Sequence, residues 1–187
     1  MMRLFVAIDL DDAVIKRLAE VQDKLRQAAK LPSGSVTWVR PGQMHLTLKF
    51  LGPVEDADVP RVCAIVQETA LRYEAFEAVC KGVGAFGSPA RVVWAGVDGG
   101  ATLKKMQREL DDRFTQAGWA AENRAFAAHL TLCRVKTASA GFALTAAAAA
   151  FAEEVFGSVW VDSIAVYESR LHSSGPEYQA ISRAAMK

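Results

Sequence analysis

The sequence is poor in histidine and cysteine, and it contains no long apolar run. Its three cysteines, Cys63, Cys80 and Cys133, are odd in number and show no C-x-x-C spacing. This pattern argues against a disulfide framework or a zinc site and fits a reducing compartment. No stretch approaches the roughly 20 apolar residues of a membrane-spanning helix, and the apolar segment at the N-terminus is too short for a signal peptide. We therefore expect a cytoplasmic protein that does not span a membrane.

A strong excess of charge of either sign is also missing. The 22 basic and 21 acidic side chains give a net charge of +1, which indicates no strong attraction to long nucleic acids or membrane surfaces. A short phosphate-bearing ligand remains compatible, because a local basic pocket is invisible in a net charge. The 187 residues, 51% hydrophobic and 23% charged, fit one sizeable globular domain or two small lobes that share a core.

One tetrapeptide occurs twice. His45-Leu46-Thr47-Leu48 returns 84 positions later as His129-Leu130-Thr131-Leu132, and these copies hold two of the three histidines. Each copy begins a short apolar run typical of a strand. Strand alternation places the histidine and the threonine of each copy on one face, and it places Lys49 on the same face as His45. Histidine is the side chain best suited to exchange protons near neutral pH.

The surrounding segments follow the same order in two approximate halves, residues 1–88 and 89–187. Each half reads as strand, helix, strand, strand, helix, strand, which predicts an internal duplication with two facing lobes. The expected strands span residues 3–8, 36–39, 45–51, 76–86, 91–97, 129–135, 156–167 and 177–182, the last after a turn at Ser174-Gly175-Pro176. The expected helices span residues 13–29, 57–73, 101–117 and 144–155. We predict that this arrangement brings the two His-x-Thr faces together across a cleft.

Two imidazoles and two threonine hydroxyls around one small site suit acid-base cleavage of a phosphodiester. One neutral histidine would take a proton from water, one protonated histidine would give a proton to the leaving oxygen, and the hydroxyls would hold phosphate oxygens. Lys49 or Arg134 could add positive charge. Strict alternation, however, puts Arg134 on the face opposite His129, so a site role for it requires a twist or a strand end. No third histidine or carboxylate cluster at ligand spacing predicts a metal.

Single histidines and threonines on strands are more often structural than catalytic, and the repetition is what favours a site here. His172 is interpreted as a loop residue, and the four tryptophans are interpreted as core or rim residues. No serine or cysteine nucleophile stands in a recognisable motif.

The repeated motif and its flanks resemble the 2H phosphoesterases, which are named for two His-x-Thr/Ser-x motifs. Within them the sequence is similar to the RNA 2′,3′-cyclic phosphodiesterase group, originally described as 2′-5′ RNA ligases. The resemblance spans essentially the whole chain. It rests on the segments at 3–8, 45–52, 89–96, 126–134, 168–171 and 175–178.

This resemblance implies a bilobal α+β fold in which two antiparallel sheets, flanked by helices, enclose a central active-site cleft in one domain, residues 1–187. It implies hydrolysis of a 2′,3′-cyclic phosphate, on RNA ends or small nucleotides, to a 2′-phosphomonoester without metal or other cofactor. His45 corresponds to the proton donor for the leaving 3′ oxygen and His129 to the base that activates water. Thr47 and Thr131 correspond to phosphate contacts, and Arg134 to a substrate contact. Ala128 stands where the group commonly has proline, which loosens the predicted placement of His129.

Two other functions remain open at this level. The same site could join a cyclic phosphate to a ribose hydroxyl, as a 2′-5′ RNA ligase, although water at ~55 M favours hydrolysis unless the acceptor is held at high effective molarity. A non-catalytic module that binds terminal 2′ or cyclic phosphates would need charge and hydroxyls, whereas two proton-transfer groups favour an enzyme. We expect a monomer.

Overall fold

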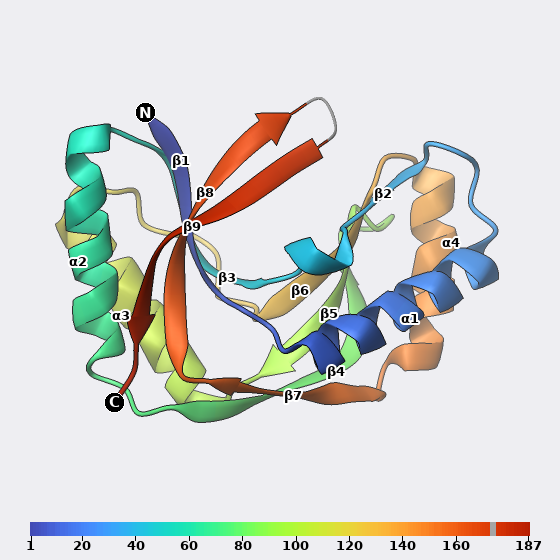
Figure 1. Cartoon of the computed structure of the whole chain (residues 1–187). Helices are drawn as coiled ribbons and strands as arrows, with labels where there is room; N and C mark the ends of the chain where they lie inside the picture. Colours follow the sequence, from blue (N-terminus) through green and yellow to red (C-terminus); the bar gives the residue numbers. More distant parts are fainter. Residues whose placement is uncertain (173–174) are drawn as a thin grey trace.

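The strands form two antiparallel sheets in the computed structural model, which describes residues 1–172 and 175–187 (Figure 1). The four-stranded sheet has the order β3-β1-β8-β9, with β1 Met2–Ile8, β3 Leu46–Val54, β8 Ser163–His172 and β9 Gly175–Ala185. The five-stranded sheet has the order β2-β6-β5-β4-β7, with β2 Val36–Trp38, β4 Phe76–Phe86, β5 Val92–Asp98, β6 His129–Val135 and β7 Val155–Val161. The predicted bilobal α+β fold with two antiparallel sheets is confirmed.

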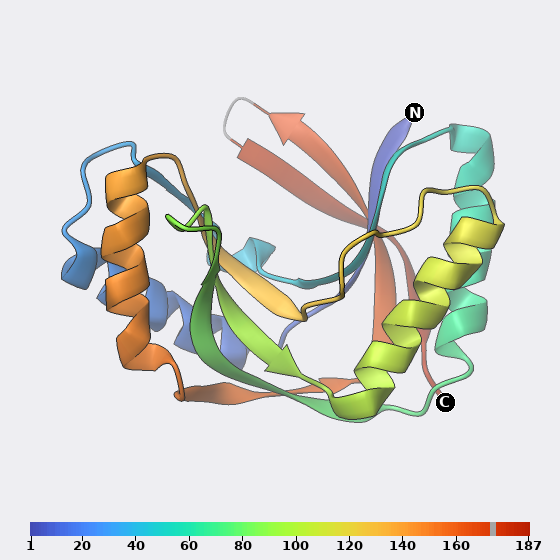
Figure 2. The same cartoon turned by 180° about the vertical axis from the view of Figure 1, so that it is seen from behind.

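Two pairs of helices flank the sheets. Helices α2 (Val59–Ala70) and α3 (Gly100–Gln116) lie side by side against the four-stranded sheet, and α1 (Asp12–Ala29) and α4 (Ala138–Ala148) lie against the five-stranded sheet (Figures 1 and 2). Each long helix buries one apolar stripe, and α1 does so with Val14, Leu18, Val21 and Leu25. Residues spaced by three or four positions share one helix face, so this spacing dictates which side meets the sheet. No helix among the described residues has the length and apolar character needed to cross a membrane.

The two sequence halves interlock instead of forming one lobe each, which corrects the expected arrangement. The order β3-β1-β8 in one sheet corresponds to the order β6-β5-β4 in the other. In the first sheet β3 and β1 come from the first half of the chain and β8 from the second. In the other sheet β6 and β5 come from the second half and β4 from the first. The cause for β4 is its short connection to β5, residues 87–91, since strands joined by a tight turn become antiparallel neighbours. The helices cross over in the same way, because α1 packs on the second sheet and α3 on the first.

Several element boundaries differ from the sequence prediction. The expected strand 156–167 is two strands in different sheets, β7 and β8, which meet at Asp162. Helix α4 begins at Ala138, six positions before the predicted start, and the hydroxyl of Thr137 accepts a hydrogen bond from the Ala140 N–H at 3.4 Å there. Gly52 and Pro53 do not close β3, which continues to Val54. Proline is tolerated because β3 is an edge strand.

The C-terminal hairpin also departs from the prediction. His172 lies at the end of β8 and not in a loop, and its Nε2 is 3.0 Å from a carboxylate oxygen of Glu177 on β9. Residue Ser174 of the expected turn lies outside the described residues. Strand β8 runs five residues beyond the expected end at 167, and β9 extends past both ends of the expected strand 177–182. The two strands pair with each other from Ser163 and Ala185 up to His172 and Gly175.

Candidate active site

His45 sits immediately before β3 in an aromatic setting. Its ring stacks on Phe5 of β1 with 4.8 Å between ring centroids, and the ring of Tyr178 from β9 meets it edge-on at 5.1 Å. Its Nδ1 is 2.9 Å from the carbonyl oxygen of Gln43. A carbonyl only accepts hydrogen bonds, so this contact assigns the proton of the neutral ring to Nδ1 and leaves Nε2 available to the cleft.

Burial disfavours a positive charge on His45. Desolvation lowers the pKa of His45 from its ordinary value of 6.5, while the hydrogen bond to the Gln43 carbonyl and the negative charge of Asp9 act in the opposite direction. Asp9 itself accepts hydrogen bonds from the Tyr167 hydroxyl at 2.5 Å and from Arg183. In the absence of ligand, the neutral form of His45 is therefore favoured.

His129, the first residue of β6, is held in the same manner. Its Nδ1 is 2.7 Å from the carbonyl oxygen of Ala127, which again is the residue two positions earlier. The ring of Phe86 packs edge-on against it with 4.9 Å between centroids, and Trp94 lies at 6.5 Å. Both histidines thus have one nitrogen held by the backbone and the other available. Alanine at position 128 leaves the carbonyl contact of the preceding residue intact.

A β-bulge interrupts each His-x-Thr strand directly after the threonine. The pairing of β3 with β1 skips Leu48, and the pairing of β6 with β5 skips Leu132. A bulge adds one residue and reverses the alternation beyond it. The residue five positions after each histidine, Phe50 or Arg134, therefore lies on the cleft face. The bulge thus explains why Arg134 lines the cleft, although strict alternation would place it on the opposite face.

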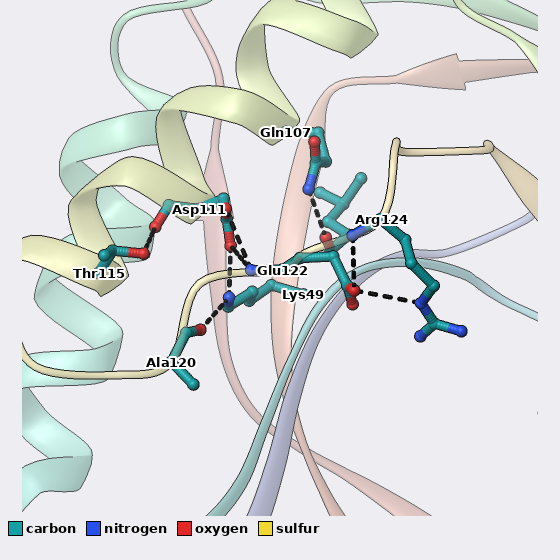
Figure 3. Close-up of polar contacts among 8 residues, drawn as sticks. Lys49, Gln107, Asp111, Thr115, Ala120, Glu122 and Arg124 are labelled. Carbon is teal, nitrogen blue, oxygen red and sulfur yellow. Dashed lines mark hydrogen bonds and ion pairs between the residues drawn. The ribbon is translucent and has the colours of Figure 1, made fainter.

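The bulge also removes Lys49 from the face of His45, so that sequence expectation is wrong. The Lys49 side chain is only 4% exposed, and its ammonium group donates hydrogen bonds to the Asp111 carboxylate and, at 2.6 Å, to the Ala120 carbonyl (Figure 3). Phe50 takes its place beside Thr47 and is 65% exposed. Lys49 consequently acts as a buried structural cation, and Arg134 and Arg3 bring positive charge to the cleft.

The predicted site residues surround one cleft of about 480 Å³ between the two sheets. Both histidines, both threonines of the repeated motif and Arg134 line it. Side chains that the sequence prediction did not assign to the site line it too: Arg3, Phe5, Gln43, Trp38, Ser169 and Tyr178. Their signal in the sequence was weak. Alternation in the first strand puts Arg3 and Phe5 on one face. The local sequence does not show, however, that this strand pairs with the distant strands β3 and β8, which brings that face to the cleft.

A second cavity of about 450 Å³ adjoins the first. The two cavities share Thr47, Phe50, His129, Thr131 and Arg134, whereas His45 lines only the first. The second cavity continues along Phe86 of β4 and along Glu122, Arg124 and Phe126 of the segment before β6. The motif residues therefore lie at a junction with open space on two sides.

No group of three or more histidine, cysteine, aspartate or glutamate side chains that could hold a metal ion occurs within residues 1–172 and 175–187. The donors that line the cleft include imidazoles, hydroxyls and guanidinium groups. Guanidinium and hydroxyl groups are donors that suit phosphate oxygens.

Two His-x-Thr strands that face one cleft between two antiparallel sheets are the arrangement expected of a 2H phosphoesterase. The family model described as the 2′-5′ RNA ligase superfamily matches residues 10–172. The chain belongs to this superfamily, and the family predicted from its sequence is confirmed.

Proteins with similar sequences or structures match this chain over nearly its full length. A protein of Methanothermobacter thermautotrophicus named RNA 2′,3′-cyclic phosphodiesterase is 34% identical over 178 residues, 94% of each chain. One of the same name from Aeropyrum pernix is 33% identical and covers 90% of this chain and 94% of its own. Among solved structures, a Thermus thermophilus protein superposes with a TM-score of 0.81 at 26% identity, covering 99% of this chain and 98% of its own. Escherichia coli LigT complexed with 3′-AMP has the same fold, with a TM-score of 0.82 at 23% identity over 100% and 98% of the two chains.

Proposed function

We propose that the protein hydrolyses 2′,3′-cyclic phosphates on RNA ends or small nucleotides to 2′-phosphomonoesters, by general acid-base catalysis without a metal. The observation that carries the proposal is the matched placement of the two histidines. Each has Nδ1 held by the carbonyl two residues earlier, and each lines the same cleft with the threonine two residues later. The names of the relatives from Methanothermobacter and Aeropyrum support the substrate class.

In the proposed reaction, neutral His129 accepts a proton from water while the water oxygen attacks phosphorus. The bond between phosphorus and the 3′ oxygen breaks, and protonated His45 gives its proton to that oxygen. Thr47, Thr131 and Arg134 hold the non-bridging oxygens, on which the transition-state charge is spread. Afterwards solvent returns His45 to its protonated and His129 to its neutral form.

The environment of His45 supports its role as the acid. A lowered pKa makes its imidazolium a stronger proton donor, and the negative charge of a bound phosphate favours that imidazolium. Substrate binding would thereby favour protonation of His45, which burial disfavours in the free protein. One chain supplies both histidines, so we propose that a monomer suffices for activity. We also propose that the protein is cytoplasmic, because its cysteines are unpaired.

The test uses purified protein with EDTA and a nucleoside 2′,3′-cyclic phosphate, followed by identification of the product isomer. We expect turnover to a 2′-phosphate. His45→Ala and His129→Ala should each lower kcat by at least about 10²-fold while the Tm stays near wild type. Absence of turnover, or its loss on chelation, would contradict the proposal. A 3′-phosphate product would reverse the identity of the leaving oxygen.

A second candidate function, transfer of the cyclic phosphate to a ribose hydroxyl, is favoured by the second cavity. An in-line displacement places the nucleophile opposite the leaving oxygen. His45, the proposed donor to that oxygen, lines only the first cavity, whereas the proposed base His129 lines both. The nucleophile would then approach from the second cavity, where exposed Phe50 offers a surface for a nucleoside base.

This candidate is tested by adding a dinucleotide with a free 5′-hydroxyl to the hydrolysis reaction. Formation of a 2′-5′-linked product would support transfer, and Arg124→Ala at the second cavity should reduce it. Arg108→Ala, which removes an exposed arginine of α3 that lines neither cavity, should leave it unchanged. A product mixture that contains only hydrolysed nucleotide would leave hydrolysis as the single function.

A further inference from the structure

Two buried glutamines occupy matching places behind the two β-bulges. Gln22 of α1 is 2% exposed and Gln107 of α3 is 7% exposed. The Gln22 amide donates to the Leu132 carbonyl at 2.8 Å. The Gln107 amide, labelled in Figure 3, donates to the Leu48 carbonyl at 3.3 Å. Both accepting residues are the extra residues of the bulges that follow the His-x-Thr motifs.

The spacing of these glutamines follows the internal repeat. The two leucines are 84 positions apart, as the histidines are, and the two glutamines are 85 apart. Each glutamine serves the motif of the opposite half, because α1 packs on the five-stranded sheet and α3 on the four-stranded sheet. The same interaction therefore occurs twice, once in each half of the site.

Such a donor stabilises a bulge. Its extra residue is left out of the hydrogen-bond ladder, and a buried carbonyl without a partner costs free energy. At Leu132 the carbonyl accepts both from Gln22 and from the Val39 N–H at 3.0 Å, and Gln22 also donates to the Val39 carbonyl at 2.8 Å. Gln22 thus joins the bulge of β6 to Val39, which lines the cleft after β2.

We propose that Gln22 and Gln107 are positioning residues of the active site, each of which maintains one bulge and so orients the cleft-lining side chains on either side of that bulge. Gln22 acts on Thr131 and Arg134, which flank its bulge. Gln107 acts on Thr47 and Phe50. Gln22 lines neither cavity, so it acts through the strand that it holds. Gln107 lines the second cavity but not the first, and its amide group donates to the Leu48 carbonyl, so we expect it to act on the first cleft through β3. The inference rests on the proposed function for its kinetic readout.

The expected effect is a loss of alignment. Gln22→Met keeps the side-chain volume and removes the donor, and Gln22→Glu replaces the donor with an acceptor that repels the carbonyl. A misplacement of about 1 Å can cost about 10²-fold in rate. We therefore expect kcat/KM to fall about 10- to 100-fold in the methionine variant and further in the glutamate variant. Gln67→Met, at an exposed position of α2, is the matched control and should behave as wild type.

Double-variant cycles separate positioning from mere stabilisation. Gln22→Met should add little to a protein that already carries Thr131→Val and Arg134→Ala, because the groups it aims are gone. In a Thr47→Val background it should keep its full effect. Gln107→Met should show the reverse pattern. Equal, additive losses in both backgrounds, or unchanged kcat/KM with only a lower Tm, would overturn the proposal.

A readout without turnover keeps this inference separate from the proposed function. The same variants can be titrated with a nucleoside 2′-phosphate, whose phosphate the aimed groups would hold. The half-specific pattern should appear in Kd even for a protein that hydrolyses no cyclic phosphate. If the wild type binds the nucleotide and the pattern is absent from Kd, the positioning role fails whatever the fate of the hydrolysis proposal.

Discussion

The buried ion pair between Lys49 and Asp111 gives a prediction whose magnitude follows from its burial. The two side chains are 4% and 17% exposed. The Asp111 carboxylate also accepts the Glu122 N–H at 3.2 Å, and Lys49 donates to the Ala120 carbonyl at 2.6 Å (Figure 3). The pair thereby connects the strand of the first motif to the segment that leads to His129.

Lys49→Met keeps the length of the aliphatic stem and removes the ammonium group. It leaves the Asp111 carboxylate without its cation and the Ala120 carbonyl without this donor. Breaking a buried pair on one side typically costs ~3–5 kcal/mol, and the partial exposure of Asp111 argues for the lower end. For a chain of this size, ~3 kcal/mol corresponds to a Tm lower by about 6–12 °C.

Thermal and urea unfolding measure this cost, and a double variant tests its origin. Lys49→Met with Asp111→Asn removes both charges while an amide oxygen still accepts the Glu122 N–H. It should recover most of the lost stability, because neutral replacement of a buried pair is often tolerated. Asp23→Asn, which removes the exposed ion pair with Arg26, should leave the Tm near wild type. A Lys49→Met protein as stable as wild type, or a double variant no better than the single one, would refute the reasoning.

Three further outcomes are expected. The NMR titration midpoint of His45 should lie below 6.5 in the free protein, because burial lowers its pKa, and should rise when a nucleoside 2′-phosphate binds. Since the unfolded chain takes up that proton more readily, His45 should also reduce stability as pH falls below 6.5; a midpoint above 6.5 would contradict the burial effect. Thr47→Val and Thr131→Val should each lower kcat/KM by about 10²-fold with little change in Tm, and equal activity would exclude a phosphate contact. Gly84→Ala would put a Cβ atom 2.4 Å from the Trp94 ring, so urea unfolding should show a loss of about 1–3 kcal/mol; an unchanged midpoint would mean that the indole moves freely.

The local pattern predicted the elements that carry the motifs well, and it failed where long-range pairing decides. The strands 76–86 and 129–135 agree with β4 and β6, because β-branched and apolar residues alternate there between turn signals. The place of β8 depends on hydrogen bonds to the distant strand β1, and the place of β4 follows from its short connection to β5 across the boundary between the two halves. The segment 156–167 gave no sign of its break, since a single residue, Asp162, separates β7 from β8.

The bulges account for the errors at the site itself. Strict alternation predicted Lys49 in the cleft and Arg134 outside it, and both assignments reverse for one reason, an extra residue at Leu48 and at Leu132. A bulge has no strong local signature in a run of apolar residues. The repeat offers an indirect signal, because Lys49 corresponds to the buried Cys133 and Phe50 to Arg134. A position occupied by cysteine in one copy is a poor candidate for a solvated lysine in the other.

The symmetric motifs become unequal through the residues that surround them. His45 is enclosed by Phe5 and Tyr178, and burial lowers its pKa. His129 lies at the junction of the two cavities, and Arg134 follows it on the same face. A histidine that readily gives up its proton belongs on the side of the leaving oxygen, and a histidine open to two cavities belongs where water or another hydroxyl enters. In the proposed mechanism, the direction of proton transfer would therefore depend on the aromatic rings around His45 and on Arg134 beside His129, and not on the identical His-Leu-Thr-Leu segments.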